Sequence, residues 1–250
     1  MDLLDFTFPV AEKPACMRDW HSQFNTEVLN AVPRQHKVIV REDTQEIISV
    51  VGETYKLVTN EDLIGQLLGE LDRMGLASYI DDANSFVENR RMRLQVTFPE
   101  ILIRDSDSQI ALSLYLHNSY DGSEAIKIHF GGVRAVCLNG MIFGEALANY
   151  YARHTSGLDL GLFQQRLQAA INQMPQLQSR ISEMEFEPVT STLRVRFEKN
   201  LGKRMAKTIF ANQPRDRWQA YNEATYLISH MIEARSRARY QLGLSSAFRL

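Results

Sequence analysis

The hydrophobic pattern of the sequence changes its period a little past the middle of the chain. Over residues 35–143, apolar and polar side chains mostly alternate, which is the period of two that half-buried strands show. Beyond residue 144, apolar side chains recur every three or four residues, as they do in amphipathic helices. The pattern therefore predicts an α+β fold, in which an N-terminal antiparallel β-meander with one inserted helix precedes a helical C-terminal half.

Short strands are predicted throughout the first half. Residues 37–41 and 46–51 are β-branched runs around the polar stretch 42–45, which indicates a hairpin, and residues 55–58 are expected to form a third strand. Further strands are expected at 91–98, 110–116, 125–130 and 133–137. We expect Gly131 and Gly132 to form a bend or bulge at a strand junction.

Alternation is clearest in residues 91–98. Met92, Leu94, Val96 and Phe98 share one face of the predicted strand, and Arg91, Arg93 and Gln95 share the other. We expect the apolar face to point into the core and the arginines to be exposed.

Helices are predicted from helix-capping residues and from the helical spacing of apolar side chains. Thr59, followed by Glu61 and Asp62, is a typical helix start, and Gly75 is a typical stop. The second half predicts helices at 145–153, 158–184, 192–211 and 218–239, with a kink or break at Pro175. Within 192–211, the alternation of Arg194 and Arg196 with apolar residues also fits a strand.

We divide the chain into three parts that form one domain overall. Residues 1–34 are a lead segment of weak periodicity, residues 35–143 are a β-rich core with the inserted helix, and residues 144–250 are a helical, basic region packed on that core.

Composition places the protein among ordinary globular chains. Its 250 residues are 44% hydrophobic and carry a formal net charge of −2, which excludes a disordered chain, a collagen-like polymer and a disulfide scaffold. The acidic start and the lack of a long apolar run favour a cytoplasmic protein.

Charge is unevenly distributed along the chain. Residues 1–100 hold 10 Lys and Arg against 17 Asp and Glu, a balance of −7, whereas residues 151–250 hold 15 against 8, a balance of +7. Either the two ends pair their charges on folding, or the basic end forms a surface for a polyanion.

On the second hypothesis, basic side chains of the C-terminal half neutralise phosphates, strand arginines add contacts and Tyr120 stacks on bases. The candidate nucleic-acid-binding residues are Arg194, Arg196, Lys199, Lys203, Arg204, Lys207, Arg215, Arg217, Arg91 and Arg93.

The sequence carries none of the common catalytic or nucleotide-binding motifs. His117, His129 and Cys137 lie on neighbouring predicted strands, but hydrogen-bonded histidines are a commoner explanation than a metal site. His117 and Asp121 likewise suggest a hairpin turn more than an enzyme. We expect no catalytic site, no metal and no cofactor, and we expect the two cysteines to be reduced thiols.

Three stretches nevertheless form a distinctive pattern: residues 118–123 (NSYDGS), 130–134 (FGGVR) and 136–141 (VCLNGM). With residues 37–60 and the helix 218–230, they resemble the phage/plasmid-like proteins catalogued as domain of unknown function 932. The resemblance spans residues 35–240, and Leu138 stands where that pattern more often has Thr. It implies a phage, prophage or plasmid setting. The motif residues are Asn118, Ser119, Asp121, Gly122, Arg134, Cys137, Asn139, Gly140, Trp218, Tyr221, Asn222, Thr225 and His230.

Most of these motif residues are types that determine turns, and we favour a structural role for them over a binding site. Asn118 and Asp121 are expected to bond turn backbone, and Asn139 and Gly140 match a type I′ turn. Asn222, Thr225 and His230 fall near one face of the last predicted helix and are expected to cap it or to bond to the sheet motif.

Two functions remain open. The first is binding of nucleic acid, with single-stranded DNA favoured, in annealing, recombination or replication. A meander crossed by a helix and followed by a basic helical half is broadly similar in topology to phage single-strand annealing proteins. The second is a protein-interaction module of a mobile element, which binds a host protein or assembles into a homo-oligomer.

Overall fold

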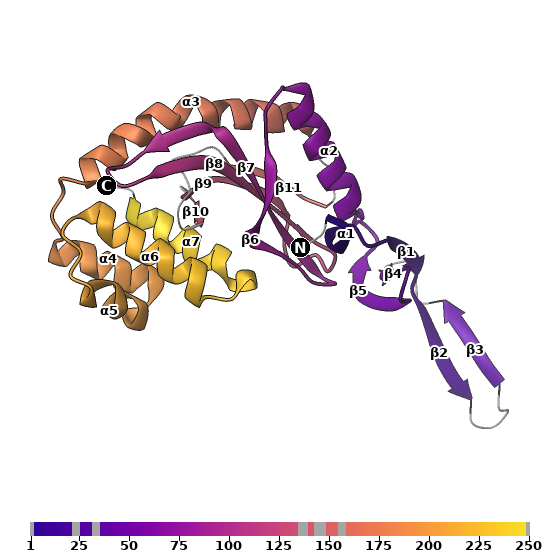
Figure 1. Cartoon of the computed structure of the whole chain (residues 1–250). Coiled ribbons are helices and arrows are strands. Elements are labelled where there is room, and N and C mark those ends of the chain that lie inside the picture. Colours follow the sequence, from indigo (N-terminus) through magenta and orange to yellow (C-terminus); the bar gives the residue numbers. More distant parts are fainter. Residues whose placement is uncertain are drawn as a thin grey trace.

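A six-stranded antiparallel sheet lies at the centre of the computed structural model of the protein (Figure 1). The structure describes residues 3–21, 26–31, 36–134, 140–142, 149–154 and 159–248. The sheet has the order β10-β9-β8-β7-β6, and β11 pairs with β9 on the edge that β10 also occupies. Its strands are β6 (Tyr79–Val87), β7 (Arg91–Arg104), β8 (Gln109–Ser119), β9 (Ile126–Arg134), β10 (Gly140–Ile142) and β11 (Tyr150–Ala152).

A second, three-stranded sheet has the order β1-β4-β5, and a separate hairpin joins β2 to β3. These strands are β1 (Val10–Pro14), β2 (Cys16–His21), β3 (Thr26–Ala31), β4 (His36–Arg41) and β5 (Glu46–Gly52). The predicted hairpin of residues 37–51 is confirmed as β4 and β5. Since β1 pairs with β4, part of the lead segment 1–34 belongs to a sheet.

The third strand predicted at 55–58 is wrong. The Tyr55 amide donates to the carbonyl of Gly52 (3.0 Å) and closes a turn, and the Lys56 amide donates to the carbonyl of His154 (2.8 Å). Tyr55 is buried, but it lies in a turn and not in a strand. The turn places its ring in a small core beside the β1-β4-β5 sheet. Residues 55–58 therefore have a strand-like pattern of apolar and polar side chains, although they do not pair with a neighbouring strand.

Two helices cover one face of the large sheet (Figure 1). They are α2 (Asn60–Arg73) and α3 (Leu160–Met184), and the chain begins with the short α1 (Leu3–Phe6). Thr59 caps α2 by accepting from the Asp62 amide (3.0 Å), and Gly75 follows the helix at a φ of 66°, as predicted. Pro175 lies inside α3 and does not end it.

The apolar face of β7 points into this core, and Met92, Leu94, Val96 and Phe98 are all buried, as predicted. Gly131 and Gly132 do not form the expected bulge, because both pair in register with Ser113 and Leu112 of β8.

Four further helices fill the C-terminal part: α4 (Ser191–Leu201), α5 (Lys203–Ala211), α6 (Arg217–Met231) and α7 (Ala234–Phe248). The single helix predicted at 192–211 is wrong, because Gly202 adopts a φ of 88° and separates α4 from α5. The strand alternative for Arg194 and Arg196 is also wrong, since both lie in α4. The helix predicted at 218–239 divides in the same way into α6 and α7.

The helix predicted at 145–153 is wrong where it is described, because residues 150–152 form β11. The strand predicted at 133–137 is the end of β9 as far as Arg134, and residues 135–137 lie outside the described residues, as does the boundary between 143 and 144. The α+β architecture itself is confirmed. Within the described residues, no helix combines the length and apolar character that crossing a membrane requires.

Candidate nucleic-acid interface

Asn118 anchors the start of α2 to the end of β8. Its buried amide donates to the Asn60 side-chain oxygen (2.9 Å) and to the carbonyl of Val58 (3.0 Å). The side-chain amide of Asn60 in turn donates to the carbonyl of Phe6 (3.0 Å). The backbone N–H of Asn60 donates to the hydroxyl of Tyr120 (2.8 Å). Asn118 therefore bonds the helix entry, and not the turn that follows it as expected.

The remaining residues of the turn shape it. Ser119 accepts from the Glu124 amide (3.1 Å) and donates to the Glu124 carbonyl (2.9 Å), which closes the hairpin between β8 and β9. Asp121 accepts from the Ser123 amide (2.9 Å), and Gly122 has the positive φ of 69° predicted for it. These contacts support the structural role favoured for the motif.

A second group of motif residues joins the sheet to α6. Arg134 and Trp218 both donate to the buried carboxylate of Asp105, and the Trp218 distance is 2.8 Å. With its amide oxygen toward them, Asn222 also accepts from Arg134 (2.8 Å) and Trp218 (3.1 Å). Asn222 thus bonds the sheet motif as predicted, and these polar side chains link α6 to the sheet through hydrogen bonds.

The other motif residues of α6 are packed locally. The ring of Tyr221 stacks on Trp218 with centroids 5.4 Å apart, and the Thr225 hydroxyl donates to the carbonyl of Asn222 (2.8 Å). His230 is exposed, and its ring lies against Tyr226. Gly140 pairs with Val133 of β9, whereas Cys137 and Asn139 lie outside the described residues.

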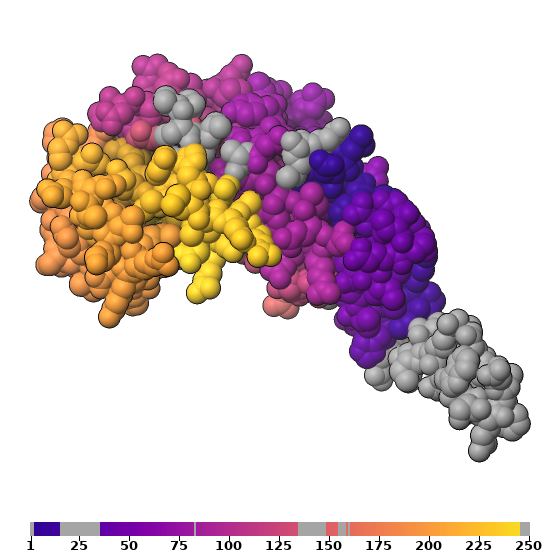
Figure 2. Space-filling view, turned by 60° about the horizontal axis from the view of Figure 1, so that its bottom comes forward, coloured from indigo at the N-terminus to yellow at the C-terminus, as the bar shows by residue number. Residues whose placement is uncertain are grey.

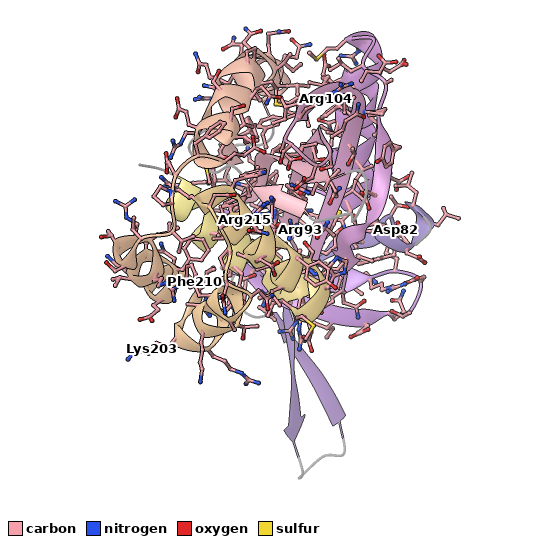
Figure 3. The ribbon with its side chains drawn as sticks, turned by 60° about the vertical axis from the view of Figure 1, so that its left-hand side comes forward. Asp82, Arg93, Arg104, Lys203, Phe210 and Arg215 are labelled. Carbon is pink, nitrogen blue, oxygen red and sulfur yellow. The ribbon has the colours of Figure 1, made fainter. Side chains whose placement is uncertain are left out.

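A basic surface covers α4 and α5. Residues 191–215 contain seven Lys and Arg but one acidic residue, Glu198. Lys203, Arg204 and Lys207 share the face of α5 that points away from its buried apolar side chains, and Lys203 extends outward in Figure 3. On the neighbouring α4, Arg194, Arg196 and Lys199 are also exposed.

The two helices are held together at this surface. The guanidinium of Arg194 on α4 lies 4.8 Å from the centre of the Phe210 ring on α5. Within the described residues, Lys199, Lys203, Arg204 and Lys207 form no ion pair, so their charges are not neutralised by a neighbouring carboxylate. We call the exposed basic residues of these two helices the α4–α5 basic surface.

An apolar groove borders this surface. It has a volume of about 580 Å³, and its lining includes Lys203 and Arg204 on one side and Leu227, Met231 and Tyr240 on the other. Figure 2 shows the orange α4–α5 region and the yellow α7 region side by side on one face of the molecule, where α4 also contacts α7. Cations and an apolar groove therefore meet at α5.

Arg215 and Arg217 do not join the α4–α5 basic surface. Arg215 is exposed but lines a different cleft, together with the acidic Asp107, Glu185 and Asp216. Arg217 is buried and donates to the carboxylate of Glu187 (2.6 Å). Burial alone would raise the pKa of Glu187, but the hydrogen bonds from Arg180 and Arg217 outweigh it and lower that pKa. Arg217 thus has a structural partner.

The two strand arginines differ in their environment. Arg91 is exposed, as predicted, and lies 3.8 Å from Glu124. The exposure predicted for Arg93 is wrong, since its side chain is fully buried between the sheet and α7 and donates to the Gln241 side chain (2.6 Å). Tyr120 is also buried, so the base stacking predicted for it is wrong.

His117 and His129 come together, whereas Cys137, the third residue of the metal alternative, lies outside the described residues. Their rings lie 5.4 Å apart, edge to face, and the Nδ1 atom of His129 lies 3.2 Å from the Asn149 side-chain oxygen. Burial lowers the pKa of His129 to about 4 despite that hydrogen bond. Burial, followed by the charges of Arg93, His129 and Lys127, lowers the pKa of His117. No group of three metal-ligating side chains occurs in the described part of the chain.

Several residues at these places were not singled out from the sequence. Lys127 and Tyr151 lie beside the two histidines, and Met231 and Tyr240 line the groove next to α5. Lys127 alternates with apolar residues in β9, and this pattern could have predicted that it shares a face of the sheet with His129. The groove combines α5, α6 and α7, so no single stretch of sequence contains it.

Comparison with known proteins identifies the family but no characterised relative. A protein-family model described as domain of unknown function (DUF932) matches residues 47–242, which is most of the chain. No curated protein and no solved structure matches the chain.

Proposed function

We propose that this chain, which belongs to the DUF932 family, binds nucleic acid through the α4–α5 basic surface, with a preference for single-stranded DNA. The observation that carries the proposal is the exposure of Lys199, Lys203, Arg204 and Lys207 without ion-pair partners among the described residues. Unpaired Lys and Arg gain free energy from phosphates, because binding releases the counterions condensed on the nucleic acid.

Preference for a single strand rests on the groove beside α5. A single strand exposes the faces of its bases, whereas a duplex stacks them inside. Lys203 and Arg204 would hold backbone phosphates while an unstacked base enters the groove and contacts Tyr240 and Met231. A duplex would gain the phosphate contacts alone.

The biological setting that we propose is recombination or replication of a phage, prophage or plasmid, in the cytoplasm. The resemblance of the sequence to phage/plasmid-like proteins supports that setting. A homo-oligomer would place several α4–α5 basic surfaces along one strand and thereby lengthen the binding site.

Fluorescence anisotropy tests the proposal directly. The full chain is titrated into a labelled single strand of about 16 nucleotides, into the same sequence as a duplex and into its RNA equivalent, at low and at physiological salt. We expect the single-stranded DNA to bind most tightly and its affinity to fall steeply with salt. A chain that binds none of the three at low salt contradicts the proposal, and equal affinity for strand and duplex contradicts the role of the groove.

A further inference from the structure

A row of polar side chains crosses the sheet on the face opposite the α2–α3 core. Arg93 of β7, His117 of β8 and Lys127 of β9 are direct cross-strand partners, and Lys127 pairs in turn with Tyr151 of β11. Side chains at paired positions lie on the same face of a sheet and are within reach of one another. The chain thus places an arginine, a histidine, a lysine and a tyrosine side by side. We call these four residues the Arg93 row.

Arg93 is a buried cation without a carboxylate among the described residues. Its guanidinium lies 4.5 Å from the centre of the Tyr115 ring, and its Nη2 atom donates to the Gln241 side chain. Its Nε and Nη1 atoms have no hydrogen-bond partner in the same part of the chain. Burial lowers the pKa of Arg93 to about 10, so the group stays charged at neutral pH. Such a charge is costly to bury unless an anion accompanies it.

The surroundings of Arg93 include another nitrogen without a partner and another cation. His117 is buried, and its Nε2 atom has no hydrogen-bond partner in the part of the chain that the structure describes. The charge of Arg237 on α7 also acts on Arg93. Among the described residues, Glu124 accepts from Lys127 at the outer end of the row (3.1 Å). The inner end therefore holds three nitrogen atoms, two of Arg93 and one of His117, that have no hydrogen-bond partner among the described residues.

Exposure increases steadily along the Arg93 row. It is 0% for Arg93 and 5% for His117, then 28% for the Lys127 side chain and 57% for Tyr151. The row therefore opens to solvent at its Lys127–Tyr151 end.

We infer that the Arg93 row binds the terminal phosphate of a nucleotide or of a nucleic-acid strand. A phosphate monoester offers several strong acceptor oxygens and about two negative charges, which match the donors of Arg93, His117 and Lys127. An internal phosphodiester continues on both sides and does not fit a site closed at Arg93. A terminal phosphate has one substituent, which leaves past Lys127, where Tyr151 can stack on a base.

The inference goes beyond the proposed function, because it assigns a second phosphate site on different elements. The test compares three labelled single strands of one sequence: one with a 5′-phosphate, one with a 3′-phosphate and one with hydroxyls at both ends. We expect one phosphorylated strand to bind the full chain at least about tenfold more tightly than the hydroxyl strand, which is the effect of one charge-assisted contact. Inorganic phosphate should remove that difference by competition.

Variants locate the effect. Lys127→Gln changes a partly exposed side chain and should fold normally. Lys127→Gln and Arg93→Met should each abolish the tenfold difference. Arg93→Lys keeps the positive charge and should retain part of the difference. The matched control is Lys203→Gln, which should weaken binding of all three strands alike. Measurable binding of all three strands by wild type with equal affinity overturns the inference, and so does a difference that survives in Lys127→Gln.

A separate readout keeps this inference distinct from the proposed function. NMR of the histidine side chains follows a titration of the full chain with inorganic phosphate alone, and we expect the His117 signals to shift. If no strand binds but phosphate shifts His117, the proposed function fails and the inference stands. If phosphate leaves His117 unchanged and competes with no strand, the inference fails even where strands bind.

Discussion

At the scale of single residues, the family motif holds the fold together through buried amide and carboxylate groups. Asn118 shows this most clearly, because its two hydrogen bonds join β8 to the entry of α2. Asn118→Ala leaves the Asn60 side-chain oxygen and the carbonyl of Val58 without that donor. We expect a loss of about 2 kcal/mol in the free energy of unfolding, measured by urea denaturation.

Asp121→Ala is the matched control for Asn118→Ala. Asp121 belongs to the same motif but makes an exposed hydrogen bond, to the Ser123 amide, so we expect a loss of less than about 1 kcal/mol. Neither substitution should change the affinity of folded protein for single strands. An Asn118→Ala protein of wild-type stability that fails to bind would show that the motif acts in binding.

His129 makes stability depend on pH. Its pKa is about 4 in the folded protein, because burial disfavours the charged ring, and about 6.5 in the unfolded chain. Both states are neutral at pH 7.5, and only the unfolded state gains the proton as the pH falls below 6.5. Stability is therefore lost on acidification, by about 2 kcal/mol at pH 5.

Denaturation of wild type and His129→Gln at pH 7.5 and at pH 5 measures this contribution. The difference in unfolding free energy between the two pH values should be smaller in the variant. An identical difference in both proteins would show that His129 is not the titrating group, and the buried His117 would be the next to test.

Arg93 shows where residue-level prediction failed. Arg93 alternates with apolar residues, which correctly placed its side chain on the face of β7 opposite the core. In a sheet that is covered on one side, that second face is exposed to solvent. Here α7, about 150 residues later in the chain, covers the second face as well through Gln241. Nothing in the residues around Arg93 encodes that contact.

At the scale of elements, Gly202 sets the angle between the two helices of the basic surface. Its φ of 88° is in the region that side chains with a Cβ rarely adopt, although a Cβ there would meet no neighbouring atom within 4 Å. We expect Gly202→Ala to cost about 1 to 2 kcal/mol of unfolding free energy through backbone strain alone.

Gly65→Ala provides the control for Gly202→Ala. Gly65 lies inside α2, and a Cβ there would also meet no neighbouring atom within 4 Å, so alanine should stabilise the helix by about 0.5 to 1 kcal/mol. Thermal or urea unfolding of the two variants should thus give opposite signs. Destabilisation by both substitutions, to the same extent, would contradict the role given to the backbone of Gly202.

Elements with local signals were predictable, and elements that depend on distant contacts were not. The cap at Thr59, the stop at Gly75 and the hairpin of β4 and β5 each follow from a few adjacent residues. Residues 150–152 form β11 because the edge of β9 is available to them, and their sequence alone favours a helix. The α4–α5 basic surface was predictable as a composition, but its groove was not.

At the scale of the whole molecule, the charge difference between the two halves persists in the folded chain. Two ion pairs each lie within a single half of the chain: Lys37 with Glu12 in the first half, and Arg217 with Glu187 in the second. The ion pair of Arg235 with Glu88 joins the two halves, at 4.0 Å. Within the described residues, Lys203, Arg204 and Lys207 therefore form no ion pair with the acidic first half. Nucleic acid should accordingly occupy one surface and not wrap around the molecule.

The salt dependence of single-strand binding tests this claim most directly. The logarithm of the association constant is measured against the logarithm of the salt concentration for wild type and for the triple variant Lys203→Gln, Arg204→Gln, Lys207→Gln, with Arg166→Gln on α3 as the control. Each phosphate contact on a single strand contributes about 0.7 to the slope, so removing three should reduce its magnitude by about 2. A triple variant with the slope and affinity of wild type would contradict the account, whereas the Arg166→Gln slope should equal that of wild type.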